Sequence, residues 1–216
     1  MKIRYLILAF TILTGSAQKP EIDYGAIISD YLDEVKAELK KEWPDNRTIN
    51  LVFHGHSVHS GYFKTPIVNT LDSYPYLVLK KLKVHYPYAM INVINTAIGG
   101  EHSLDGEKRF EPDVLIHKPD VLFIDYALND RAIGLEKSYK AWDSMIDKAL
   151  EKGIKIILLT PSPDQREDIL ELNNRLHQYT EQIKRLSKEN GTGLIDSYGL
   201  FKNKVVSGDS ISSFMS

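Results

Sequence analysis

The sequence predicts an α/β protein in which a five-stranded parallel sheet lies between two layers of helices. One observation is a series of short apolar runs that end in glycine, proline or polar residues, which is typical of buried parallel strands. Another is that longer stretches with helical periodicity separate these runs. Right-handed crossovers through such helices place successive strands parallel in one sheet. The length of 216 residues suits one domain of this kind.

Five runs carry the strand signal: 48–53, 91–95, 120–126, 155–160 and 193–196. The first run leads directly into His54-Gly55-His56-Ser57, and the second is closed by Gly99-Gly100. Ligands bind beside the carboxyl ends of the strands in sheets of this type. We therefore expect the functional residues in the loops that follow the first three strands: 54–61, 96–103 and 127–134.

Helical periodicity covers the segments between the strands: 21–42, 74–85, 112–118, 135–152 and 169–186. The clearest case is 135–152, where apolar residues recur every three or four positions and Gly153 ends the helix. The segment 21–42 is interpreted as a helix laid on the domain, and Pro44-Asp45 stops it.

The composition excludes several function classes. There are 27 basic and 29 acidic residues with no basic stripe, which argues against nucleic-acid binding. The chain has no cysteine, which excludes thiol catalysis, cysteine-bound zinc and disulfides. Apolar residues at 43% and charged residues at 26% are typical of a globular domain.

Residues 1–17 have the pattern of a secretory signal peptide. Lys2 and Arg4 precede the uncharged stretch 5–13, and Gly15-Ser16-Ala17 offers small residues for cleavage. The apolar stretch is too short to span a bilayer, and no cysteine follows for lipid attachment. We expect an exported protein, periplasmic or extracellular, without a membrane anchor.

The three loops contain the residue types of an acyl-transfer site. Ser57 follows strand one, where a serine at the turn into a helix exposes its hydroxyl. Gly100 lets the backbone approach a substrate closely and present an N–H. The side-chain amide of Asn129 can donate to a developing oxyanion.

With these motifs the chain resembles the SGNH, or GDSL-type, hydrolase family over nearly all of residues 48–216. Gly55-His56-Ser57 is similar to the family's Gly-Asp-Ser block, and Ala127-Leu128-Asn129-Asp130 is similar to its Gly-x-Asn-Asp block. Gly100 resembles the glycine of its second block. The resemblance implies a flavodoxin-like three-layer fold, with Ser57 as nucleophile. It also implies an oxyanion hole made by the Ser57 N–H, the Gly100 N–H and the Asn129 amide.

The chain departs from the family pattern at three places. His56 and Ala127 replace an aspartate and a glycine, and we expect His56 and Asp130 to contact substrate. The family's fourth block, a histidine before the last helix, has no counterpart up to Ser216, so we expect the chain to stop before its general base. His102 is the loop histidine that we keep as an alternative base.

We therefore divide the chain into a signal peptide (1–17), an N-terminal helical extension (18–47) and an SGNH hydrolase-like domain (48–216) that is incomplete at its C-terminus. We expect an exported serine ester hydrolase that needs no cofactor or metal, has no membrane anchor and does not bind nucleic acid. Its substrate is expected to be a small-molecule or glycan ester. Acetylated carbohydrate is favoured because aromatic residues follow the nucleophile loop: Tyr62, Phe63, Tyr74 and Tyr76.

Other interpretations stay open. Ser57 could be only a helix cap, and Asn129-Asp130 could be a turn pair. Three histidines near strand one could form a metal site: His54, His56 and His59. The alternative function is that of a catalytically inactive carbohydrate-binding protein, because the general-base histidine is absent. The oligomeric state cannot be predicted.

Overall fold

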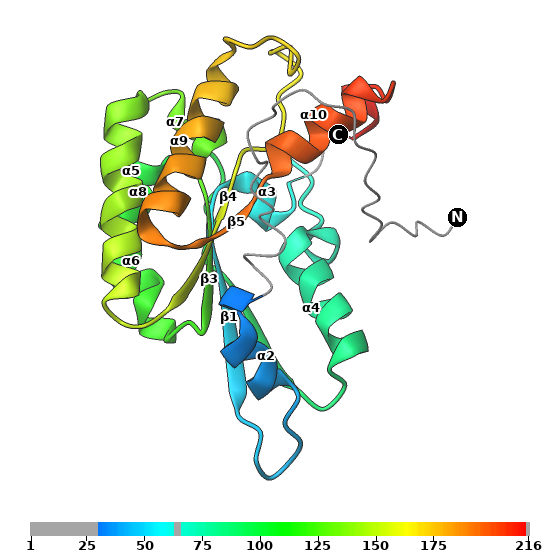
Figure 1. The fold of residues 1–216 in the computed structure, drawn as a ribbon, viewed down its shortest axis with the longest axis vertical. Helices are drawn as coiled ribbons and strands as arrows, with labels where there is room; N and C mark the ends of the chain where they lie inside the picture. The colour runs from blue at the N-terminus through cyan, green and yellow to red at the C-terminus, as the bar shows by residue number, and fades with distance from the viewer. Residues whose placement is uncertain (1–29, 63–65, 215–216) are drawn as a thin grey trace, which may run out of the picture.

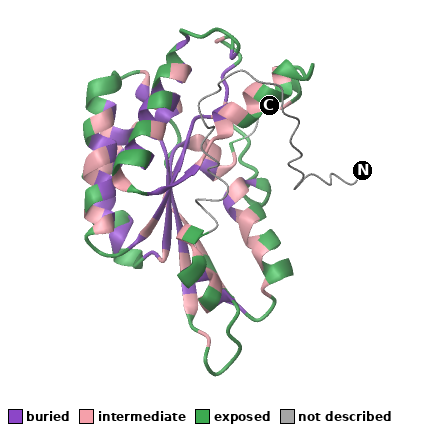
Figure 2. Ribbon diagram, in the orientation of Figure 1, coloured by how far each residue is buried: buried purple, intermediate pink, exposed green. Residues whose placement is uncertain are grey.

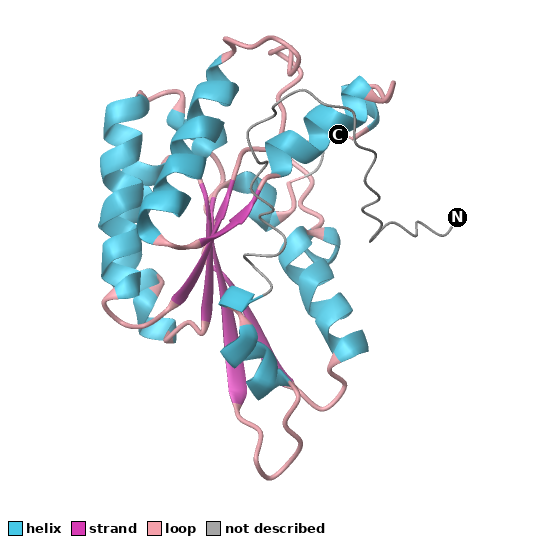
Figure 3. Cartoon of the chain, viewed as in Figure 1, coloured by secondary structure: helices cyan, strands magenta, loops and turns pink. Residues whose placement is uncertain are grey.

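A computed structural model of the chain describes residues 30–62 and 66–214. Five parallel strands form one sheet in the order β2-β1-β3-β4-β5. Helices cover both faces of this sheet (Figures 1 and 3). The predicted three-layer α/β/α architecture is confirmed.

All five strands coincide with predicted ones: β1 (Thr48–Gly55), β2 (Met90–Asn95), β3 (Val121–Asp125), β4 (Lys155–Leu159) and β5 (Gly193–Ile195). Every residue of the central strand β3 is buried, and Figure 2 shows the strands as the most buried part of the fold. Strands covered on both faces are apolar throughout rather than alternating. This burial explains the continuous apolar runs in the sequence.

The helices form two layers (Figure 1). One face carries α5 (Ser103–Lys108), α6 (Phe110–Asp113), α8 (Leu135–Leu150) and α9 (Arg175–Asn190). The other face carries α2 (Asp33–Leu39) and α4 (Tyr74–His85). Three more helices begin directly after strands: α3 (Ser57–Ser60), α7 (Ala127–Asp130) and α10 (Ser197–Val206). Trp142 and Ile146 of α8 pack into the first core cluster, and Phe53 and Phe123 lie in the second, on the opposite face.

Several helix predictions need correction. The predicted helix 112–118 is instead the end of α6 followed by a 3₁₀ turn at Leu115–His117. The helix predicted for 169–186 begins only at Arg175 because Asn174 caps it, accepting a hydrogen bond from the His177 N–H at 2.7 Å. Ile169 and Leu172, which fitted the periodicity, lie in the preceding loop, Ile169 buried and Leu172 exposed. Helix α10 carries no strong periodic signal and was not predicted.

The N-terminal extension is part of the domain core as far as it is described. Val35 and Leu39 of α2 are buried against the sheet, and the backbone N–H of Ile156 donates to the Tyr31 hydroxyl at 2.9 Å. The helix ends at Leu39, before the predicted stop. The predicted signal peptide, 1–17, lies outside the described residues. Within the part of the chain that is described, no helix is long and apolar enough to cross a membrane.

Candidate active site

Hydrogen bonds join the three loops at the carboxyl edge of the sheet. Strand β1 lies between β2 and β3, so the loops that follow these strands are neighbours. The Ile98 N–H donates to the Gly55 carbonyl at 3.1 Å, which links the second loop to the first. The Asn129 side chain donates to the Glu101 carbonyl at 2.9 Å, which links the third loop to the second. Hydrogen bonds thus link loops that are far apart in sequence.

Ser57 is the first residue of α3 and is half-buried. The residue that caps this helix is His56, whose ring accepts a hydrogen bond from the Val58 N–H. Helix α3 ends at Gly61, whose φ of 81° lies in the left-handed region that glycine adopts at no steric cost. The cap interpretation of Ser57 therefore loses its support, because the neighbouring residue fills that position.

Gly100 is exposed at the tip of the second loop, with a φ of 78°. No atom lies within 4 Å of the position that a Cβ would occupy there, so the space beside this glycine is open. Among the described residues, none accepts a hydrogen bond from the Gly100 N–H. A side chain is disfavoured here by the backbone conformation. The preceding Gly99 is packed tightly, since a Cβ there would lie 3.1 Å from the Tyr62 hydroxyl.

Asn129 lies in the short helix α7 and is half-buried. Its side-chain nitrogen carries two hydrogens, and the bond to the Glu101 carbonyl uses one of them. The second hydrogen is free to meet an incoming oxygen. The bond to Glu101 also fixes the orientation of the amide group, which is the condition for donating to a developing charge without reorganisation.

A buried polar network holds Glu101 beneath this surface. The Tyr126 hydroxyl lies 3.1 Å from His54 Nε2 and donates to the Glu101 carboxylate at 2.8 Å. The Arg109 Nε also donates to Glu101, at 2.8 Å. Burial, with the positive charge of Arg109, lowers the pKa of His54 to about 3, so this ring is neutral. The network fixes the carbonyl that orients Asn129. Sequence reasoning missed it, although Glu101 directly follows Gly100.

His56 is placed differently from the expectation. Its ring is fully buried, with Nε2 lying 3.4 Å from Asp125 Oδ1 at the end of β3. The ring packs against the end of β3 and is not open to solvent, so the structure does not show the predicted substrate contact. His56 instead joins the start of α3 to the end of β3.

Asp130 is also fully buried. Its carboxylate accepts hydrogen bonds from the Ser103 N–H at 2.7 Å, the Ser138 hydroxyl at 2.6 Å and the Trp142 Nε1 at 2.8 Å. These three donors come from α5 and α8. The predicted contact with substrate is therefore corrected to a structural role, in which Asp130 ties α7 to two helices. Asn129 and Asp130 form the end of a helix rather than an isolated turn.

The histidines near β1 do not form a metal site. Both ring nitrogens of His54 are engaged, with Thr96 Oγ1 at 2.9 Å and the Gly106 carbonyl at 3.2 Å. No group of three potential ligands in suitable geometry occurs within the described ranges. The loop histidine His102 is partly exposed, and its Nε2 lies 3.3 Å from Asp105 Oδ2.

His59 is expected to make the protein acid-sensitive. Burial lowers its pKa to about 3, below the usual 6.5. A histidine whose folded pKa is depressed stabilises the fold above its unfolded pKa, and this stability is lost as the pH falls towards the folded pKa. We expect the free energy of unfolding to fall between pH 6.5 and 3, with this residue contributing up to about 1.4 kcal/mol per pH unit.

The variant His59→Phe isolates this contribution. The ring packs against Phe53 and Tyr74, and neither ring nitrogen has a hydrogen-bond partner among the described residues. Phenylalanine therefore keeps the packing and removes the titration. Urea unfolding measured across this pH range should give a shallower acid limb for the variant. An unchanged slope would contradict the assignment.

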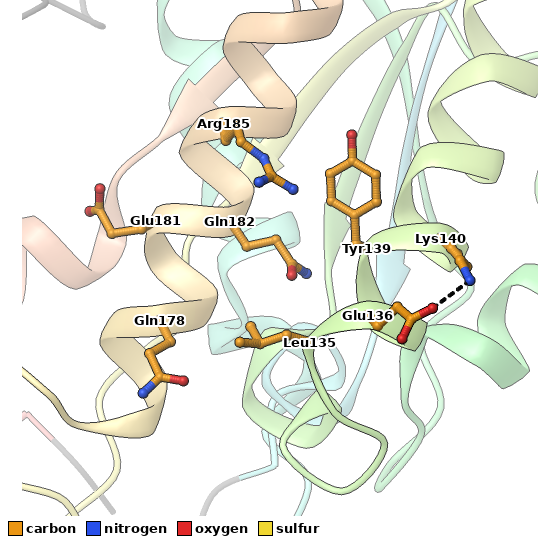
Figure 4. Close-up of a pocket in the computed structure, with 8 residues that line it drawn as sticks. All are labelled: Leu135, Glu136, Tyr139, Lys140, Gln178, Glu181, Gln182 and Arg185. Carbon is orange, nitrogen blue, oxygen red and sulfur yellow. Dashed lines mark hydrogen bonds and ion pairs between the residues drawn. The ribbon is translucent and has the colours of Figure 1, made fainter.

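Two cavities lie beside these loops or away from them, and Val58 of the first loop lines one of the two. A groove of about 510 Å³ lies between α8 and α9, with the ion pair Glu136–Lys140 at its rim (Figure 4). Across the groove the Arg185 guanidinium lies 4.7 Å from the centre of the Tyr139 ring. Neither this groove nor the cavity of about 470 Å³ on the opposite face is lined by the three predicted catalytic residues: Ser57, Gly100 and Asn129.

Residues 53–210 match the GDSL-like lipase/acylhydrolase family model. The chain belongs to this family. The match includes all three loops described above, and it confirms the resemblance seen in the sequence motifs. The family is one of ester-hydrolysing enzymes, and its serine chemistry in this chain is considered below.

Two curated relatives align with part of the chain. An acetylxylan esterase of Geobacillus stearothermophilus is 27% identical over 138 residues, which is 57% of this chain and 62% of that protein. The uncharacterized lipoprotein YqeF of Bacillus subtilis is 33% identical over 97 residues, 41% of this chain and 38% of that protein. The alignments thus span less than two thirds of either relative.

Solved structures share the fold at low identity. A catalytic mutant of the Geobacillus stearothermophilus acetylxylan esterase superposes with a TM-score of 0.63 at 21% identity, covering 81% of this chain and 85% of that one. A two-domain esterase active on acetylated mannans gives 0.66 at 22% identity, covering 82% and 44%. These likenesses establish the common α/β architecture.

Proposed function

We propose that this protein is a serine ester hydrolase with Ser57 as the nucleophile. The observation that carries the proposal is the hydrogen-bonded junction of the three loops. It combines a serine at the start of α3 with an open glycine N–H and an amide that has one hydrogen free. The family membership supports the same reaction class.

In the proposed reaction the Ser57 hydroxyl attacks the ester carbonyl carbon and gives up its proton to a base. The Ser57 N–H, the Gly100 N–H and the Asn129 amide hold the negative oxygen of the tetrahedral intermediate. The carbon–oxygen bond to the alcohol then breaks, and the alcohol leaves with a proton. Water releases the acyl group from Ser57 in a second, equivalent step.

The base must be a group that can reach the Ser57 hydroxyl. His54, His56 and His59 are fully buried, which prevents contact with substrate. His102 is in the second loop and partly exposed, and Asp105 lies close enough to orient its ring. His102 is therefore the candidate base within the described residues.

Acetylated carbohydrate is the substrate that we favour. Two proteins of the same fold are named for acetylxylan and acetylated mannan. The Tyr62 ring lies beside the second loop, in contact range of Gly99, where it can stack on a sugar. The signal-like pattern of residues 1–17 supports action outside the cytoplasm.

The test is hydrolysis of p-nitrophenyl acetate and of acetylated xylo-oligosaccharides by the wild type, Ser57→Ala and Ser212→Ala. We expect Ser57→Ala to lose activity to the background rate, because the residue that forms the acyl-enzyme is gone. The exposed Ser212 is the matched control and should be neutral. Activity that survives Ser57→Ala would reject the site.

The alternative is a carbohydrate-binding protein without catalysis. It is favoured by His56 in place of the family's aspartate. A wild type that binds the xylo-oligosaccharide by calorimetry but does not hydrolyse it would support this alternative.

A further inference from the structure

A second cavity, of about 470 Å³, opens on the α2 and α4 side of the sheet. Its floor is made by the ends of β3, β4 and β5, and its walls come from α4, α10 and the segment that follows Ser57. Figure 1 shows α4 and α10 on this side of the molecule. The volume is in the range of small-molecule sites. The proposed catalytic groups do not line it.

Aromatic rings dominate the lining of this cavity: Tyr62, Tyr74, Phe123, Phe201 and Phe214. Phe123 is held by stacking on Phe53, with ring centres 4.3 Å apart. Phe201 and Phe214 meet edge to face at 5.7 Å. Aromatic faces attract cations, and Lys204 already lies 5.2 Å from the Phe214 ring. The walls are therefore suited to a positively charged group.

Asp125 is the one charged side chain among the described residues that line the cavity. It is 3% exposed, and its Oδ1 accepts no hydrogen bond from any described residue. His56 Nε2 lies 3.4 Å from this oxygen, which is a long contact. A buried carboxylate with a single long contact is poorly satisfied, so a further donor would stabilise it.

The Tyr74 hydroxyl is a second buried polar group that lacks a hydrogen-bond partner among the described residues. Burial and the negative charge of Asp125 raise the pKa of Tyr74, so the hydroxyl stays protonated. A neutral hydroxyl can accept a hydrogen bond from the same ligand that donates to Asp125.

From the rings and the unsatisfied carboxylate we propose that this cavity binds a small organic cation, an ammonium group on an apolar body, with Asp125 as its counter-ion. The apolar body lies against Phe123 and Phe201. An anionic ligand is excluded by the charge of Asp125. The cavity adjoins the candidate active site through Tyr62, which also contacts Gly99, but the two sites share none of the proposed catalytic groups.

Isothermal titration calorimetry of the full chain tests the proposal with three probes that share a phenyl ring and differ in charge: benzylammonium, benzyl alcohol and phenylacetate. We expect benzylammonium to bind, benzyl alcohol to bind at least tenfold more weakly and phenylacetate not to bind. The variant Asp125→Asn should weaken benzylammonium at least tenfold. Asp147→Asn, an exposed aspartate on α8, is the matched control and should leave binding unchanged.

The outcomes separate this site from the proposed catalysis. Ser57→Ala should bind benzylammonium like the wild type, and loss of binding there would overturn the proposal. Equal affinity for the amine and the alcohol would overturn it too, as would unchanged binding in a folded Asp125→Asn. If thermal melting shows that Asp125→Asn does not fold, the variant Phe201→Leu takes its place in the binding measurement. It keeps the apolar volume and removes a ring, so weaker amine binding supports the proposal and unchanged binding overturns it.

Discussion

Replacing Asn129 by alanine is expected to lower kcat for p-nitrophenyl acetate about 10²- to 10³-fold, with a much smaller change in KM. The amide is held by the Glu101 carbonyl at 2.9 Å, so its second hydrogen is positioned before the substrate arrives. The negative charge on the substrate oxygen develops only in the transition state. Loss of the donor therefore affects turnover more than binding. Steady-state kinetics of the purified variant measure both constants.

The control for this variant is Asn173→Ala. Asn173 is an exposed asparagine in the loop before α9 and should be neutral. A similar kcat for wild type and Asn129→Ala would remove the third loop from the proposed oxyanion hole. A large increase in KM with unchanged kcat would show instead that Asn129 stabilises the ground state and the transition state equally.

Replacing Asp130 by alanine is expected to reduce the free energy of unfolding by about 3 kcal/mol or more. Three buried donors lose their acceptor: the Ser103 N–H, the Ser138 hydroxyl and the Trp142 Nε1. Each buried donor left without a partner costs about 1–3 kcal/mol. Urea unfolding followed by circular dichroism measures the loss.

Two further variants test this interpretation. Asp130→Asn keeps one oxygen as acceptor and should lose less stability than Asp130→Ala. Asp147→Ala removes an exposed carboxylate on α8 and should stay within about 0.5 kcal/mol of the wild type. If Asp130→Ala were as stable as this control, the buried hydrogen bonds would have no net effect on folding. The expectation that Asp130 binds substrate would then need to be reopened.

The strands could be predicted because buried strands have a recognisable local composition. The runs at 120–126 and 155–160 contain β3 and β4, since strands covered on both faces need apolar residues at every position. The positions of Ser57, Gly100 and Asn129 after successive strands were predictable for the same reason. The hydrogen bonds that join the three loops, which are accepted by the Gly55 and Glu101 carbonyls, are known only from the structure.

Other features escaped sequence reasoning for identifiable reasons. Ile169 fits the helical spacing of α9, but the helix begins only after Asn174, which caps it. Apolar spacing alone does not show where the capping residue stands. His56 and Asp130 lie in loops that follow strands, which is the position where functional residues are expected. Their burial depends on Asp125 and Trp142, which belong to other segments.

Local sequence patterns are enough to predict the α/β architecture, the order of strands and helices along the chain and the three loops that carry the candidate catalytic residues. These features follow from apolar periodicity and turn residues, which act over short stretches of chain. The packing of the folded chain is needed to show which loop side chains reach solvent, how Glu101 orients Asn129 and where Asp125 meets an aromatic cavity. Burial and hydrogen-bond partners are set by segments distant in sequence, so no local pattern encodes them.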